Sequence, residues 1–256
     1  MAAILLTGAN QGIGFYMAQQ LLEDGHQVAV LDLVTDELAP LAAQYGKRLL
    51  PFVCDVTDGA AVAEAVLSAV QEFGGVEYAI HNACVCTFEG FLQSDEDTFR
   101  RVHEVNFYGA LHLTKAVLPT MLQQKRGKVF FVSSGVGVTG FTNISPYASS
   151  KGALESLAKC LHLEYQSQGV TFHLLHPPLT KTASSAPLPV PKEMMADPEQ
   201  VGRGLAKRLN QKKFVICHSA SQTLQTKMAY RFPLALGGLM SKMAANYEQA
   251  AVKSDT

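Results

Sequence analysis

The sequence predicts an α/β fold in which one doubly wound parallel sheet of about seven strands lies between two layers of helices. Short apolar runs alternate with longer segments of helical periodicity, and this alternation is typical of a parallel sheet with helices on both faces. A hydrophobic content of 48% in 256 residues supports a large core, and no linker interrupts the pattern. We therefore expect residues 1–256 to form a single three-layer α/β/α domain.

The elements are expected to follow one another in regular order. The first strand covers 2–7, because Ala2 to Leu6 form an unbroken apolar run of the kind found in buried parallel strands. The second covers 27–32 and ends at a carboxylate, and later apolar runs repeat the pattern. Strands are predicted at 2–7, 27–32, 49–54, 76–81, 127–133, 170–176 and 213–217, and helices at 13–24, 36–44, 59–73, 95–107, 109–124, 146–167 and 197–209.

A glycine-rich turn, Thr7 to Gly14, joins the first strand to the first helix. Gly8 permits a tight turn, Gly12 lets the backbone approach a pyrophosphate, and Gly14 allows the helix to pack closely on the strand. The N-terminus of the helix attracts phosphate. An ordinary glycine-rich turn is the alternative, but the strand before it and the helix after it favour a dinucleotide site of the Rossmann type.

Asp32 ends the second strand, about 20 residues past the turn, where a carboxylate can hold both hydroxyls of a ribose. A 2′-phosphate would meet this carboxylate as a like charge, and no Arg or Lys lies within Thr7 to Gly14 or beside Asp32 to offset the repulsion. The sequence therefore favours NAD over NADP. The competing interpretation is an aspartate that begins a polar turn before Val34.

Tyr147 and Lys151 are spaced to lie on one face of a helix. A neighbouring ammonium favours phenolate, so we expect the Tyr147 pKa to fall from its reference of about 10 toward the working pH, where proton transfer is most effective. The alternative for the pair alone is a solvated helix face.

These residues together resemble the short-chain dehydrogenase/reductase family from about Ala2 to Thr182. The family's glycine motif is matched by Thr7, Gly8, Gly12, Ile13 and Gly14, the acid after its third strand by Asp55, and its Tyr-x-x-x-Lys pair by Tyr147 and Lys151.

The resemblance implies a catalytic serine thirteen positions before Tyr147, which is Ser134, with Ser133 as the fallback. It also implies that Asn106 is the catalytic asparagine, which anchors a water that links Lys151 to solvent. The cofactor site implied by the motifs comprises Gly8, Asn10, Gln11, Gly12, Ile13, Gly14, Asp32, Asp55, Val56, Asn82, Ala83, Tyr147, Lys151, Pro177, Thr180 and Thr182, with Thr182 holding the nicotinamide amide.

Two positions depart from the family's usual pattern. Cys84 replaces a glycine after the fourth strand, which puts a side chain where backbone normally runs near the cofactor. Pro178 replaces a glycine after the sixth strand, which removes a backbone N–H and restricts Pro177. We expect altered cofactor or substrate contacts rather than loss of activity.

The expected function is NAD(P)-dependent oxidoreduction, in which a hydride moves between nicotinamide and an alcohol or ketone. Tyr147 would supply the proton, Ser134 would donate a hydrogen bond to the same oxygen, and Lys151 would lower the tyrosine pKa and hold the nicotinamide ribose. The alternatives are a non-catalytic, cofactor-binding regulatory relative and an epimerase or dehydratase on the same fold.

Beyond the cofactor and catalytic core, 1–182, the sequence predicts a Pro-rich substrate lid at 183–196 and a C-terminal helical tail at 218–256. Five of the eight methionines lie beyond residue 190, which suits an apolar, lipid-like substrate or a subunit contact. The apolar run from Phe232 to Met240 is too short to span a bilayer, though it could lie on one.

Charge and cysteine content exclude other classes. A formal net charge of −1 gives no footprint for nucleic acid. Five cysteines without Cys-x-x-Cys spacing fit reduced thiols, and His81, Cys84 and Cys86 are expected to be strand-end residues rather than metal ligands. Met1 to Ile4 contain no basic signal region, so we expect a cytoplasmic protein. The family resemblance implies a homodimer or homotetramer that pairs through 109–124 and 146–167.

Overall fold

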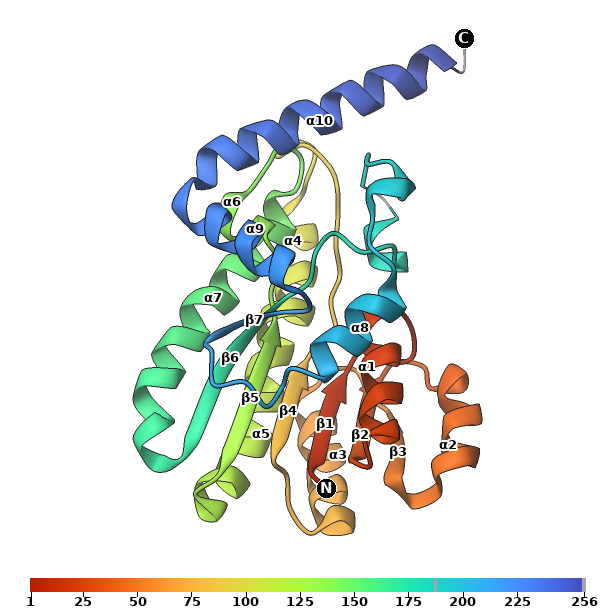
Figure 1. Cartoon of the computed structure of the whole chain (residues 1–256), viewed down its shortest axis with the longest axis vertical. Coiled ribbons are helices and arrows are strands. Elements are labelled where there is room, and N and C mark those ends of the chain that lie inside the picture. The colour runs from red at the N-terminus through yellow and green to blue at the C-terminus, as the bar shows by residue number, and fades with distance from the viewer. Residues whose placement is uncertain (187, 255–256) are drawn as a thin grey trace.

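The computed structural model describes residues 1–186 and 188–254, and within them one sheet holds seven strands (Figure 1). The strands are β1 (Ala3–Thr7), β2 (Gln27–Asp32), β3 (Leu49–Val53), β4 (Tyr78–His81), β5 (Gly127–Val132), β6 (Val170–His176) and β7 (Val215–Cys217). They pair in parallel in the order β3-β2-β1-β4-β5-β6-β7. The chain thus winds outward from the centre in both directions, which confirms the predicted doubly wound sheet.

Helices cover both faces of the sheet. One face carries α1 (Gly12–Glu23), α2 (Ala39–Tyr45) and α8 (Pro198–Ala206), and the other carries α3 (Gly59–Phe73), α5 (Gly109–Gln124) and α7 (Ser145–Tyr165). The short helices α4 (Glu96–His103) and α6 (Val136–Thr139) lie beside α7.

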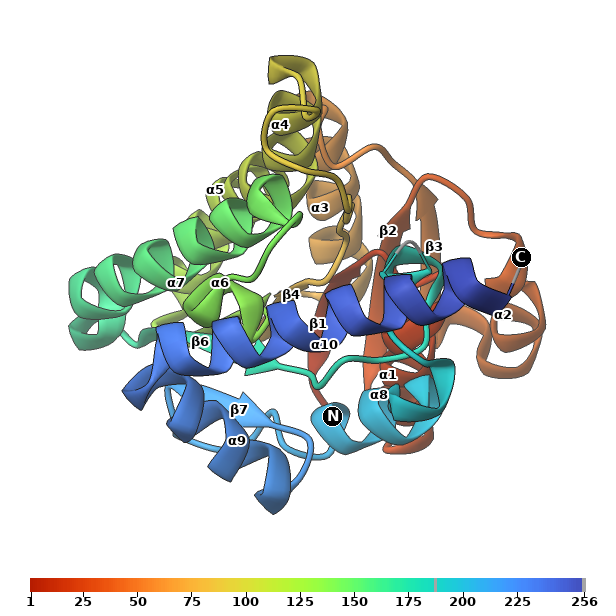
Figure 2. The ribbon, with the colours of Figure 1, turned by 90° about the horizontal axis from the view of Figure 1, so that it is seen from above.

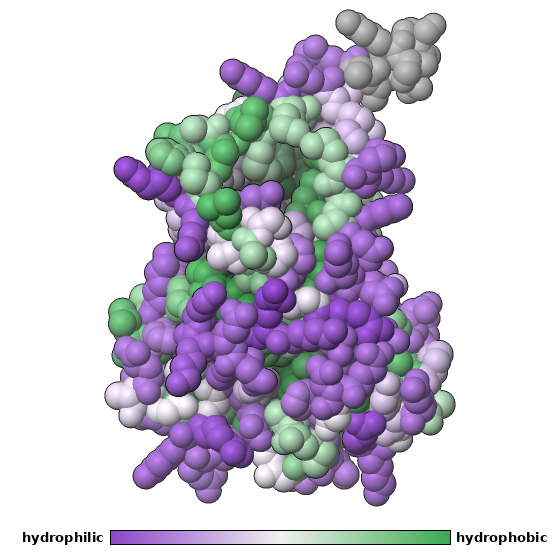
Figure 3. Space-filling view, in the orientation of Figure 1, coloured by the Kyte–Doolittle hydropathy of each residue, from purple (hydrophilic) through white to green (hydrophobic). Residues whose placement is uncertain are grey.

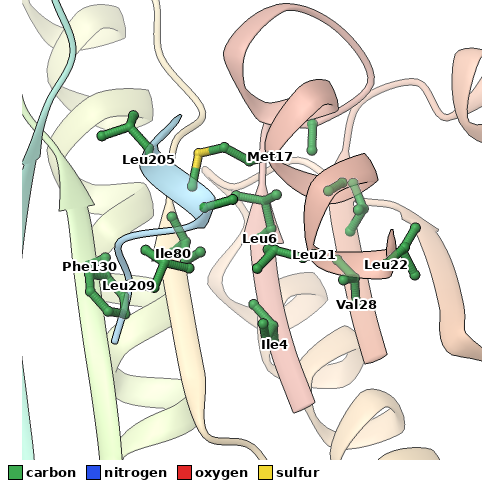
Figure 4. Close-up of a cluster of buried hydrophobic side chains, with 14 of the residues drawn as sticks. Ile4, Leu6, Met17, Leu21, Leu22, Val28, Ile80, Phe130, Leu205 and Leu209 are labelled. Atoms are coloured by element: carbon green, nitrogen blue, oxygen red, sulfur yellow. The ribbon is translucent and has the colours of Figure 1, made fainter. Parts of the chain in front are cut away.

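Alternate residues of each strand supply the two halves of the core. Ile4 and Leu6 pack with Met17 and Leu21 of α1, as Figure 4 shows, whereas Leu5 faces α3 and α5 on the other side. Because both faces are covered, the middle residues of β1, β4 and β5 are apolar, and this is why continuous apolar runs identified these strands.

Several expected bounds differ from the structure because the hydrogen bonds at the ends of the elements depart from the regular pattern. Helix 95–107 ends at His103 and continues as a π-helical turn, Glu104–Tyr108. Helix 36–44 begins with a 3-10 turn at Asp36–Leu38. Helix 197–209 ends at Ala206, since the N–H groups of Arg208 and Leu209 bond three residues back instead of four. Strand 76–81 starts at Tyr78, because the Val76 N–H donates to the Gln124 side chain instead.

Two further helices, α9 (Ala220–Arg231) and α10 (Pro233–Ser254), follow β7 and account for the helical character expected of 218–256. Both views show α10 crossing above the carboxyl ends of the strands (Figures 1 and 2). Residue 187 of the expected lid and residues 255–256 of the tail lie outside the described residues. Within the described residues, no helix combines the length and apolar character that crossing a bilayer requires.

Candidate active site

The glycine-rich turn closes against the end of β4. Gly8 and Gly12 adopt φ values of +66° and +63°, which favour glycine. A Cβ on Gly8 would lie 2.5 Å from the Cα of Ala83, and a Cβ on Gly14 would lie 2.3 Å from the Gly8 carbonyl oxygen. A Cβ on Gly12 would instead lie 3.3 Å from Cγ2 of Thr182. Backbone packing therefore requires the first and third glycines.

The Thr7 hydroxyl joins the ends of β1 and β4. Its oxygen accepts hydrogen bonds from the backbone N–H groups of Asn82 and Ala83, both at 3.1 Å, and lies 3.1 Å from Nδ1 of His81. The Asn82 side chain donates to the Gly8 carbonyl at 2.5 Å. Burial lowers the pKa of His81 to about 3, so this imidazole is neutral and serves as part of the scaffold.

A groove of about 290 Å³ follows the carboxyl ends of the strands beside this turn. Asp32 lines it from the end of β2, and its Oδ2 accepts a hydrogen bond of 2.8 Å from the Asn10 N–H. Asp55 lines it from the loop after β3, held in a turn by the N–H of Thr57 at 2.9 Å. The expected cofactor residues that line this groove are Gly8, Gln11, Gly12, Ile13, Asp32, Asp55, Val56, Asn82, Ala83 and Thr182.

The groove fits a dinucleotide. In the described part of the chain, no side chain caps the first turn of α1, so its backbone N–H groups are free to bind a pyrophosphate. The absence of a Cβ at Gly12 leaves room for a phosphate to approach the backbone. The carboxylate of Asp32 lines the groove at the position where it could bind a ribose.

Tyr147 and Lys151 lie one turn apart on α7 and face a second cavity together with Ser134, which follows β5. The Lys151 Nζ donates to the Val132 carbonyl at 2.8 Å and lies 5.6 Å from the centre of the Tyr147 ring. Lys151 is 1% exposed, and a Cβ on Gly137 would lie only 2.9 Å from its Cβ. Close packing of α6 on α7 thus fixes the base of the lysine.

The expected fall in the Tyr147 pKa is wrong for this state of the protein. Burial raises the pKa of the phenol well above its usual value, and negative charge on Cys84 or Cys86 would act in the same direction, while hydrogen bonding to Ser134 opposes it. Burial also lowers the pKa of the Lys151 ammonium. Loss of water from an apolar pocket therefore outweighs the attraction of the ammonium, which already donates to a backbone carbonyl.

The two candidate serines have different surroundings. Ser133 is 1% exposed, and its hydroxyl donates to Oε1 of Glu155 at 2.5 Å. Ser134 is partly exposed and faces the cavity beside Tyr147. The geometry favours Ser134 for contact with a substrate, because the hydroxyl proton of Ser133 is already engaged.

Asn106 lies in the π-helical turn and is absent from the lining of both cavities. Its amide accepts from the Val85 N–H at 2.7 Å and donates to the Val85 carbonyl and the Ser150 hydroxyl, both at 2.9 Å. The fully buried side chain thereby ties the loop after β4 to α7.

Two of the expected cofactor residues, Asn10 and Gly14, line neither cavity. Asn10 binds Asp36 at 2.9 Å and accepts from the Glu37 N–H at 3.0 Å, so its side chain holds the loop after β2. Gly14 is buried beneath the turn. Pro177 and Thr180 do line the second cavity.

The second cavity holds about 770 Å³ and is mainly apolar. The core contributes one part of the wall, the segment 183–196 that is expected to form a lid contributes Leu188 and Val190, and the tail contributes residues of α9 and α10. Figure 3 shows apolar surface gathered around a hollow beneath α10. The tail side chains that line this cavity are Gln222, Leu224, Gln225, Thr226, Met228, Ala229, Leu236, Leu239, Met240 and Met243.

The two cavities meet at shared walls, among them Asn82, Cys84 and Ser184. The Cys84 Sγ lies 3.9 Å from the Ser184 hydroxyl, so the cysteine that replaces the family's glycine links the groove to the lid. Sequence reasoning missed Cys86 as a cavity residue and also missed Phe141 and Ile144. Their one signal was apolar character in the loops after β4 and α6. Burial raises the pKa of the Cys86 thiol to about 12, so this cysteine is not a reactive thiolate.

Comparisons with known proteins place this arrangement in a family. The short chain dehydrogenase family model matches residues 2–192. Oxidoreductase UcpA of Salmonella typhimurium is 34% identical over 213 residues, which are 80% of this chain and 79% of UcpA. The chain spans 63% to 79% of the length of the first curated relatives that it matches.

Solved structures share the fold. A short-chain dehydrogenase from Streptomyces avermitilis superposes with a TM-score of 0.80 at 23% identity, covering 100% of this chain and 99% of that one. An NAD⁺-bound xylitol dehydrogenase gives a TM-score of 0.73 at 26% identity, covering 84% and 97% of the two chains. The chain belongs to the short-chain dehydrogenase family of oxidoreductases.

Proposed function

We propose that this protein is an NAD(P)-dependent oxidoreductase that moves a hydride between nicotinamide and an apolar alcohol or ketone, with Tyr147 as the acid and base. The observation that carries the proposal is that Tyr147, Lys151 and Ser134 face an apolar cavity that shares walls with the groove beside the glycine-rich turn. Proton donor, hydrogen-bond donor and cofactor groove thus converge on one volume.

The residues that would hold the cofactor are the free N–H groups of α1 for the pyrophosphate, Asp32 for the adenosine ribose, Lys151 for the nicotinamide ribose and Thr182 for the nicotinamide amide. When bound, the nicotinamide supplies or accepts the hydride. Support for a nicotinamide dinucleotide comes from the NAD⁺-bound xylitol dehydrogenase, a structural neighbour. We propose NAD rather than NADP, because a 2′-phosphate would lie against the Asp32 carboxylate.

The phenol of Tyr147 is protonated before the reaction. Burial raises its pKa, so the phenol is neutral at physiological pH and can donate to the oxygen on which negative charge develops during carbonyl reduction. Ser134 would donate a second hydrogen bond to that oxygen, and the buried ammonium of Lys151 would stabilise the phenolate left behind. In the direction of alcohol oxidation, the same groups would work in reverse.

We further propose that the substrate is apolar and lipid-like, since the lid and the tail contribute mostly aliphatic and methionine side chains to the cavity. We place the enzyme in the cytoplasm. The five free cysteines support a reducing compartment.

Replacing Tyr147 with Phe tests the assignment. The variant should fold and bind NAD(H) as before, and it should lose about 100-fold or more of its turnover on alcohols and ketones, because only the proton donor is removed. Tyr165→Phe, on the last turn of the same helix, is the matched control and should keep full activity. Normal turnover by Tyr147→Phe would sink the assignment.

A further inference from the structure

A buried carboxylate, Glu155, is the centre of a polar cluster outside the proposed catalytic set. Its Oε1 accepts from the Ser133 hydroxyl at 2.5 Å and lies 2.7 Å from Nε2 of His176. Its Oε2 accepts from the Tyr230 hydroxyl at 2.5 Å, and that hydroxyl is also 3.4 Å from Nε2 of His176. Glu155 is 4% exposed and His176 is fully buried, whereas Tyr230 is 39% exposed, so the carboxylate is buried and the phenol reaches it from the surface.

The cluster joins the catalytic core to the tail. Glu155 lies two turns after Tyr147 on the same face of α7, and Ser133 precedes Ser134 at the end of β5. His176 ends β6, directly before Pro177. Tyr230 comes from α9, the first helix of the tail. One carboxylate therefore receives contacts from three elements besides its own.

The hydrogen-bond pattern requires Glu155 to be ionised. The two hydroxyls donate to it, and His176 donates through Nε2, because its Nδ1 finds no partner among the described residues and a proton there would be buried unpaired. These donors keep the pKa of Glu155 below its usual value in spite of the opposing effect of burial. Charge-assisted hydrogen bonds of this kind are about twice as strong as neutral ones.

Helix α9 has little else to hold it on the core. The described side chains that it buries are Thr226 and Ala229, which are small, and Thr226 contacts Cys217 of β7 at 3.4 Å. Its larger apolar residues, Leu224 and Met228, are 64% and 43% exposed and line the open cavity. Because apolar burial is small, the hydrogen bond from Tyr230 to the buried carboxylate of Glu155 should contribute strongly to holding this helix on the core.

We propose that Tyr230 is a positioning residue whose phenol, bound to Glu155, holds α9 in place as a wall of the apolar cavity and so determines which apolar substrates fit. The part that concerns substrates rests on the proposed function. The part that concerns the helix rests on the hydrogen bonds alone, so the two are tested separately.

Hydrogen exchange tests the anchoring. In Tyr230→Phe, amides of residues 220–232 should exchange about tenfold faster or more, while those of α3 on the far face of the sheet should be unchanged. Tyr247→Phe, which changes a tyrosine of α10 that is 40% exposed against 39% for Tyr230, is the matched control and should leave α9 as it is. Unchanged exchange of α9 in Tyr230→Phe would overturn the proposal.

A fluorescent long-chain fatty acid tests the cavity wall without relying on turnover. Tyr230→Phe should bind this probe at least several-fold more weakly than the unmodified protein, whereas NADH affinity should stay the same. In kinetics, KM should rise for long-chain ketones and remain near normal for short ones. If short and long ketones were affected alike, or if the probe bound equally well, the role in specificity would be wrong even where α9 had loosened.

A double-mutant cycle identifies the partner. Glu155→Gln keeps the size of the side chain but loses the charge that accepts both hydroxyl donors, so it should also accelerate exchange in α9. Adding Tyr230→Phe to it should then cause little further change, because the shared contact is already broken. Fully additive effects would show that Tyr230 acts through some other contact and would overturn the assignment.

Discussion

Gly14→Ala should destabilise the protein although it places a better helix former in the first turn of α1. The added Cβ would lie 2.3 Å from the Gly8 carbonyl oxygen, 2.6 Å from the Asn82 Nδ2 and 2.8 Å from the Cα of Ala9. Two of these three atoms belong to the backbone and cannot rotate away. The third already donates to the same carbonyl at 2.5 Å. Helix and turn must therefore move apart.

Overpacking of this kind costs about 1–3 kcal/mol, and the intrinsic helical preference of alanine returns at most about 1 kcal/mol. The free energy of unfolding should thus fall by about 1–2 kcal/mol. For a chain of this size the melting temperature should fall by roughly 2–8 °C. NADH affinity should fall as well, because the displaced segment includes the proposed pyrophosphate site.

Urea unfolding and NADH fluorescence titration measure the two effects. The matched control is Gly238→Ala in α10, where an added Cβ meets no atom within 4 Å, so the helical preference alone should raise stability by up to about 1 kcal/mol. If Gly14→Ala were as stable as Gly238→Ala and bound NADH normally, the close packing of turn on helix would not constrain the sequence as argued.

Three further predictions follow from the same structure. Asp32→Ala should narrow the gap between NAD(H) and NADP(H) binding, and tighter binding of NADPH by the unmodified protein would contradict the NAD assignment. The free energy of unfolding, measured with urea, should be about 4 kcal/mol lower at pH 5 than at pH 7. Burial lowers the pKa of His81 to about 3 and of His173 to about 4, against 6.5 when unfolded, so below pH 6.5 the unfolded chain takes up protons that the fold excludes. A stability that is flat over this range would refute the burial of these neutral imidazoles. Light scattering should show a dimer or tetramer paired through α5 and α7, where Leu163 is 72% exposed, and a monomer at micromolar concentration would refute this pairing.

The parallel sheet could be predicted because its signals are local. The middle of a strand covered on both faces is apolar, so β1 and β2 stand out as apolar runs. The glycines of the turn follow from backbone geometry within eight residues. The first and last residues of an element could be predicted less well where they depend on hydrogen bonds to groups far away in the sequence. The Gln124 side chain that receives the Val76 N–H is 48 positions away along the chain.

The properties of the site that depend on burial could not be predicted from local sequence signals. The spacing of Tyr147 and Lys151 indicates a pair, but it carries no information on how much water the cavity excludes, and that exclusion reverses the expected pKa shift of the phenol. Asn106 shows the same limit, since its partners Val85 and Ser150 meet it only in the folded chain. Glu155 offered a signal that could have been used, because an acid two turns after Tyr147 lies on the same helix face.

The segment after β6 lines both cavities, so it would contact the proposed cofactor and the proposed substrate. Thr182 faces Gly12 across the groove. Its backbone N–H is held in place, because it donates to the Ser185 hydroxyl at 3.0 Å. That hydroxyl donates in turn to the Thr180 carbonyl at 2.7 Å, and Ser185 lines the substrate cavity. A dinucleotide that contacts Thr182 would therefore also hold the first turn of the lid. Because Ser185 also lines the substrate cavity, we expect cofactor contact at Thr182 to stiffen one wall of that cavity.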